Sequence, residues 1–163
     1  MAVNIHLKLA GIDGESATKG YEKQLEVLSW QVGVTQTASA HFAEGSGTGK
    51  CDISDLTITK YVDKSSPILF GHSASGKHIA SGQLTLKKAG GDESVIYMTI
   101  DMEDVIVSAY NVGGTPSDDR IVETVTLNFG KVHMAYKPQD KKGAGGADIK
   151  AGWNIPQNAT WSK

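Results

Sequence analysis

Apolar and polar residues alternate along most of the chain, which is the period of a β-strand with one buried face. Segments rich in turn-forming glycine separate the alternating stretches. The predicted strands cover about residues 2–10, 22–36, 50–61, 79–88, 94–110 and 119–136. No repeat or linker divides the pattern, so we predict one mainly β domain over residues 1–163.

The longest predicted strands change phase partway along. In 119–136 the apolar positions shift by one residue after Gly130, and 22–36 and 94–110 show the same shift. A one-residue shift marks a β-bulge, or a strand whose two halves bury opposite faces. Long strands do this when they curl into a barrel or extend past their own core. Apolar side chains on both faces of a strand have to be buried. Either another subunit buries them, or the chain is a monomeric sandwich that buries them itself.

One segment departs from the strand pattern and predicts a short helix over residues 62–75. Asp63 or Ser65 can cap its start, and Pro67 suits its first turn. Gly76 can end it, because glycine readily adopts the left-handed conformation that follows many helices.

Two segments are predicted to be irregular. Residues 37–49 are rich in Ala, Ser, Gly and Thr and predict a long loop. Residues 137–150 are rich in Lys, Gly and Ala, so 137–163 is predicted to be a loop followed by a C-terminal segment.

The composition supports the predicted strands and excludes several classes of protein. Valine, isoleucine and threonine number 12 each, and these β-branched residues favour strands. The formal net charge is −2 and Arg120 is the sole arginine, so we expect no nucleic-acid binding. No apolar run approaches the length of a membrane-spanning helix, so we expect no membrane insertion. The alternating first residues predict a strand, so we expect a cytoplasmic protein made without a signal peptide.

The chain carries no convincing catalytic or metal motif. Residues 71–77 match the first part of a phosphate-binding loop, but His78 stands where a magnesium-binding Ser or Thr belongs. The five histidines show no metal-ligand spacing, and the G-x-S-x-G nucleophile pattern does not occur. We therefore expect no enzyme activity and no cofactor.

Eight short segments follow one another along nearly the whole chain: residues 14–16, 27–30 with Gly33, 60–67, 75–78, 84–91, 123–129, 136–139 and 152–155. Taken together, these segments resemble the hemolysin-coregulated protein (Hcp) family, the tube protein of the type VI secretion system.

The resemblance implies a two-sheet β-barrel with one short flanking helix, six copies of which assemble into a ring. Rings stack into a tube that a contractile sheath on a baseplate expels with a spike protein at its tip. The protein then reaches the exterior or a target cell, and secreted effectors travel in the ring lumen.

The resemblance also implies that the loop 37–49 contacts neighbouring subunits or rings. The contact residues expected there are Thr37, Ala38, Ser39, Ala40, His41, Phe42, Gly45, Gly47 and Gly49.

A lumen that passes varied cargo should be polar and weakly charged. Polar residues that alternate with core positions are candidates for its wall, and Gln31 is the candidate for direct contact with cargo. The wall candidates are Thr57, Thr59, Gln83, Thr85, Thr124, Thr126 and Asn128.

Two other functions remain as alternatives. A monomeric β-sandwich that binds a glycan or another ligand would need an exposed aromatic platform. A small hydrolase would use Ser73 or Ser75 with His78.

Overall fold

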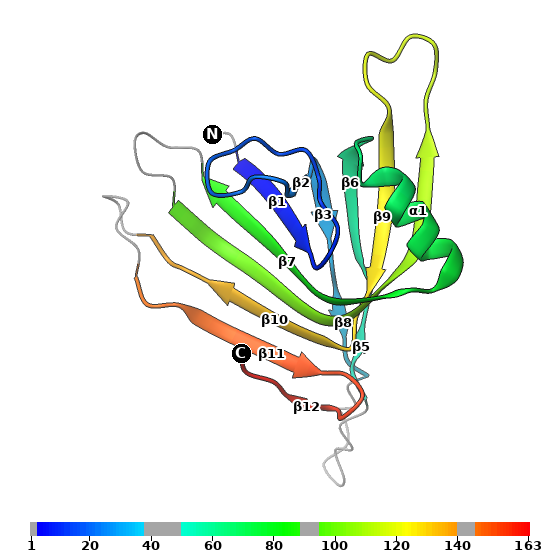
Figure 1. Cartoon of the computed structure of the whole chain (residues 1–163). Coiled ribbons are helices and arrows are strands. Elements are labelled where there is room, and N and C mark those ends of the chain that lie inside the picture. The colour runs from blue at the N-terminus through cyan, green and yellow to red at the C-terminus, as the bar shows by residue number, and fades with distance from the viewer. Residues whose placement is uncertain (1–2, 38–49, 89–94, 140–145) are drawn as a thin grey trace, which may run out of the picture.

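The computed structural model of the chain describes residues 3–37, 50–88, 95–139 and 146–163 (Figure 1). Twelve strands and one helix are assigned in these residues, which confirms the mainly β prediction. The strands are β1 (Val3–Leu9), β2 (Leu25–Glu26), β3 (Ser29–Gln31), β4 (Val34–Thr35), β5 (Asp52–Ile53), β6 (Leu56–Tyr61), β7 (His78–Lys88), β8 (Val95–Gly113), β9 (Val122–Asn128), β10 (Lys131–Tyr136), β11 (Ile149–Asn154) and β12 (Ala159–Thr160). The helix α1 spans Ser66–Ser75.

The long strand β8 belongs to both halves of the barrel. Its first half pairs with β7 and β10, within a sheet ordered β12-β11-β10-β8-β7-β1-β2. Its second half pairs with β9, which continues to β6 and β3. Residues 25–31 close the barrel, because β2 pairs with β1 and the following β3 pairs with β6. The predicted two-sheet barrel is therefore confirmed.

A bend at Asp104 lets both halves of β8 bury apolar residues. Asp104 has a left-handed backbone with φ 55°, and Gly130 opposite donates its N–H to the carbonyls of Glu103 and Asp104. Ile100 lies in the core before the bend and Val105 after it, so the buried parity changes by one. The predicted phase shift is confirmed as a bulge-like irregularity, although 119–136 forms two strands, β9 and β10.

The prediction of one strand over 22–36 is wrong, because this segment crosses between the two sheets. Val27 donates its N–H to the carbonyl of Ile5 in β1, and Leu28 donates to the carbonyl of Thr59 in β6. The crossing divides the segment into β2, β3 and β4. The stretch 50–61 is likewise divided, because β5 leaves the barrel to pair with β4.

Two further boundaries differ from the sequence prediction. The helix begins at Ser66 instead of residue 62, after a turn in which Asp63 accepts the N–H groups of Ser65 and Ser66. It ends as predicted at Gly76, with φ 65°. The C-terminal segment contains β11 and β12, which the sequence pattern did not predict.

Lys60 is completely buried under the start of α1. Its Nζ lies 2.6 Å from Glu123 Oε1 and 2.9 Å from Asp63 Oδ1, and it donates to the carbonyl of Tyr61 at 2.8 Å. A buried ammonium needs such partners, because its desolvation is otherwise costly.

Glu123 connects this ion pair to two further elements. Ser66 at the start of α1 donates to its Oε1 at 2.9 Å, and Tyr110 of β8 donates to its Oε2 at 2.5 Å. The buried cluster of Lys60, Asp63, Ser66, Tyr110 and Glu123 therefore fixes α1 on β6, β8 and β9.

We expect Lys60→Met to lower the free energy of unfolding by about 3–5 kcal/mol, because it leaves buried carboxylates unpaired. The double variant Lys60→Met/Glu123→Gln should lose less than the sum of its single variants. Urea unfolding measures both. Lys131→Met is the control, since its pair with Glu103 is partly exposed and worth about 1 kcal/mol or less. Additive losses would contradict a coupled buried pair.

Tyr110 should make the fold sensitive to alkaline pH. Burial, together with its hydrogen bond to Glu123, raises the pKa of Tyr110 from 10.0 to about 12. The folded state then holds this proton more tightly than the unfolded chain, so the stabilisation is complete below pH 10 and is lost between pH 10 and about 12.

The test compares urea unfolding of the native protein and Tyr110→Phe at about pH 9 and about pH 11.5. The native protein should lose more stability over this interval than the variant. Equal losses would show that another group causes the alkaline sensitivity.

Candidate functional site

One outward face of the barrel gathers most of the predicted lumen residues. Register places Gln31, Thr57 and Thr126 in one row across β3, β6 and β9, and Thr59 and Thr124 in the next. The polar face, as we define it, consists of Ser29, Gln31, Thr57, Thr59, Asn111, Thr124, Thr126 and Asn128. Ser29 and Asn111 were missed in the sequence; the parity of Ser29 with Gln31 could have revealed the former.

The polar face presents hydroxyl and amide groups without charge. Thr57 Oγ1 lies 3.5 Å from Thr126 Oγ1, and both side chains are half-exposed. The intervening residues Ile58 and Val125 point inward and are fully buried. The hydroxyl and amide groups of such a wall can offer weak hydrogen bonds to many surfaces.

The other two predicted wall residues do not belong to this face. Gln83 and Thr85 lie on β7, in the opposite sheet, and their side chains point away from the core on that side. Thr85 is only 3% exposed, so it offers no surface to a cargo protein. Strand parity reveals which residues point outward, but not from which sheet, and this is why the predicted set mixed two faces.

The face that carries Thr85 is partly covered by the segment after β1. Tyr21 stacks on His6 with ring centroids 4.7 Å apart, and Lys87 lies over the Tyr21 ring. His6 pairs in register with Thr85 and is itself buried. Burial lowers the pKa of His6 below its usual range, so the neutral ring is favoured there.

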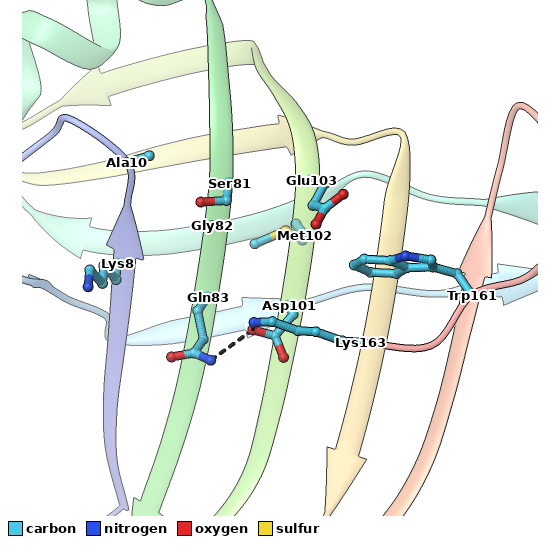
Figure 2. Close-up of a pocket in the computed structure, with 10 residues that line it drawn as sticks. All are labelled: Lys8, Ala10, Ser81, Gly82, Gln83, Asp101, Met102, Glu103, Trp161 and Lys163. Atoms are coloured by element: carbon cyan, nitrogen blue, oxygen red, sulfur yellow. Dashed lines mark hydrogen bonds and ion pairs between the residues drawn. The ribbon is translucent and has the colours of Figure 1, made fainter.

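Gln83 lines a cavity of about 510 Å³ on this opposite face (Figure 2). Its Nε2 donates to Asp101 Oδ1 at 2.7 Å, and Lys163 Nζ lies 2.6 Å from the same oxygen. Trp161 forms one wall, and Lys8 lies at the other side of the opening. The buried carboxylate in this cavity is therefore already neutralised by the chain itself.

The structure describes few contacts of the remaining predicted residues. Thr37 is exposed, and the other loop residues lie outside the described part of the chain: Ala38, Ser39, Ala40, His41, Phe42, Gly45, Gly47 and Gly49. Ser75 donates its hydroxyl to the carbonyl of Gly71 within α1 at 2.8 Å.

The described part of the chain contains neither a metal-binding cluster nor a membrane-spanning helix. Its residues bring together no group of three or more His, Cys, Asp or Glu side chains suited to a metal ion. Nor is any helix within them long and apolar enough to cross a membrane.

Comparison with known proteins gives one consistent family. Residues 6–136 match the family described as "Type VI secretion system effector, Hcp". Protein hcp1 of Pseudomonas aeruginosa is 43% identical over 159 residues, covering 97% of this chain and 98% of that protein.

Solved structures agree. A structure described as a type six secretion system protein aligns with a TM-score of 0.91 and 29% identity, covering 98% of this chain and all of the other. Hcp1 from Salmonella typhimurium aligns with a TM-score of 0.81 and 33% identity, covering 99% of this chain and all of the other.

The monomeric binding module is not favoured by these relatives, whereas the predicted secretion role is confirmed. The barrel, the matched residues and the relatives lead to one conclusion: the chain belongs to the Hcp family and is a tube protein of the type VI secretion system.

Proposed function

We propose that six copies of the chain close into a ring whose lumen is lined by the polar face, and that rings stack into the secretion tube. The observation that carries this proposal is a pair of exposed apolar patches on different sides of one barrel. Each patch arises where a sheet extends past the core.

The first patch, which we call the β10–β11 shelf, consists of Met134, Tyr136 and Ile149. Tyr136 and Ile149 are directly paired, and Met134 shares their face of the sheet. They are 37%, 47% and 65% exposed. Met134 pairs with the fully buried Ile100, so the shelf lies on the core-facing side of its sheet. The shelf is exposed because it extends past the second sheet, which covers the core.

The second patch, which we call the helix patch, consists of Phe70, Val112 and Ile121. Phe70 of α1 packs edge-on against Tyr110 of β8. Val112 follows two residues after Tyr110, and Ile121 two residues before Glu123, so both share the side of the hairpin that faces α1. The three are 61%, 53% and 49% exposed.

The two patches suit a head-to-tail contact between copies. Figure 1 shows α1 and β11 on different sides of the barrel. A contact between two different patches is heterologous, and it generates a ring when its rotation closes. The family resemblance supplies the number six. The phase shifts along the sequence turn apolar residues to two faces of the chain. A head-to-tail contact would bury the apolar residues on both faces.

The polar face is the surface best suited to the lumen. Its hydroxyl and amide groups would form weak hydrogen bonds with cargo proteins of different surface chemistry, with Gln31 in direct contact. Gln83 and Thr85 are withdrawn from the proposed wall, because they lie on the opposite face. The loop 37–49, including Thr37, is proposed to contact neighbouring subunits or rings.

The proposed role is structural and needs no cofactor or catalysis. The ring would carry secreted effectors, join a spike protein at the tip of the tube and be expelled by a contractile sheath on a baseplate. It would leave the bacterial cytoplasm by this route and reach the exterior or a target cell.

Substitution of one residue in each patch tests the head-to-tail contact. Phe70→Glu and Tyr136→Glu should each give a monomer of 17.3 kDa, because every contact uses both patches. A mixture of the two variants should give a dimer of about 35 kDa, because one intact helix patch can meet one intact shelf. Light scattering after gel filtration measures these masses.

Ala17→Glu is the matched control, because it places the same carboxylate on an exposed segment outside both patches. It should assemble like the native chain. If each patch instead contacted its own copy, the single variants would remain dimers, and the heterologous ring would be excluded.

A further inference from the structure

A single carboxylate interrupts the otherwise uncharged polar face. Asp55 lies immediately before β6, the strand that contributes Thr57 and Thr59. The outward residues of the rows beside it are Thr, Ser, Asn, Gln and Ala. Asp55 is therefore the carboxylate beside the described rows of this face, and it is partly exposed; the cation on the same side, Arg120, lies at the far end of β6 over the Tyr61 ring.

Side chains from two other elements hold this carboxylate in place. Asn128 of β9 donates from Nδ2 to Asp55 Oδ1 at 2.8 Å, and Ser108 of β8 donates from Oγ to Asp55 Oδ2 at 2.6 Å. Ser108 lies where the pairing of β8 and β9 shifts register, and such a bulge re-aims a side chain. Both carboxylate oxygens are thus fixed by neutral donors.

The carboxylate remains available to a partner. None of the ion pairs among the described residues involves Asp55, in contrast to Asp101 on the opposite face, which holds Lys163. A carboxylate can accept about four hydrogen bonds, and two neutral donors leave capacity on each oxygen. Neutral donors stabilise the negative charge without cancelling it, so a cationic group is the kind of ligand that this carboxylate would attract most strongly.

We propose that Asp55 is a specificity-determining residue that selects cargo presenting lysine or arginine side chains to the polar face. This inference rests on the proposed function, since a closed ring is what would place the Asp55 carboxylates of all copies on one circle. A circle of carboxylates attracts cationic groups more strongly than a single one, and neighbouring hydroxyl and amide groups then bind the cargo surface without charge.

The test uses native rings and two fluorescent peptides of glycine and serine, one with four lysines and one with four glutamates. Native rings should bind the lysine peptide about tenfold more tightly than the glutamate peptide, and added salt should weaken that binding. Asp55→Asn should reduce the affinity for the lysine peptide about fivefold or more, while the mass of the ring stays unchanged.

Asp13→Asn is the matched control, because it removes the same charge from an exposed segment outside the polar face. It should leave the affinity for the lysine peptide unchanged. An equal loss of affinity in both variants would show general charge attraction and overturn the inference. Native rings that do not prefer the lysine peptide would also overturn it. Failure of the native chain to form rings is seen separately in its mass, and the inference would fall with the proposed function.

Discussion

The structure depends on one strand that is too long for the core it helps to enclose. β8 has 19 residues and therefore spans about 60 Å at about 3.3 Å per residue. Its middle lies between the two sheets, and the bend at Asp104 lets each half turn apolar residues inward. Both ends extend past the core, where β10 and β11 accompany one end and α1 the other. The exposed apolar patches at these ends are thus a consequence of strand length, and they are the surfaces through which copies of the chain are proposed to meet.

The buried ionic cluster has a more local but related role. Lys60 and Glu123 hold the start of α1 against β6 and β9, and Tyr110 extends the cluster to β8. Phe70 follows on the same helix and packs on Tyr110. The position of the helix patch therefore depends on a fully satisfied polar network inside the barrel, where loss of one charged partner would be costly.

Much of the fold could be predicted from the sequence, because strand period, glycine turns and phase shifts are local signals. The helix end at Gly76 and the phase change near Gly130 were found this way. The crossing of residues 25–31 between sheets could not be predicted, since it depends on hydrogen bonds to the distant residues Ile5 and Thr59. The C-terminal strands were missed because β11 is half-exposed and lacks a clear alternation.

Prediction of the candidate site was limited in the same way, by its dependence on distant residues. Alternation identified Thr57, Thr126 and four more residues that the structure brings to one face, because outward position is a property of the strand itself. It could not separate them from Gln83 and Thr85, because the sheet to which a strand belongs is set by pairing with distant residues. Lys60 and Glu123 belong to two of the Hcp-like segments, but their buried pairing depends on β6 and β9 lying side by side, which the sequence pattern does not reveal.

The most direct measurement is the absolute mass of the native protein in solution, by light scattering after gel filtration, with electron micrographs of the same peak. The exposed patches at the two ends of β8 predict closed rings of six copies of the 17.3 kDa chain, about 104 kDa. A monomer across a wide range of concentration, or dimers that do not grow into rings, would contradict the proposal that these patches join copies head to tail.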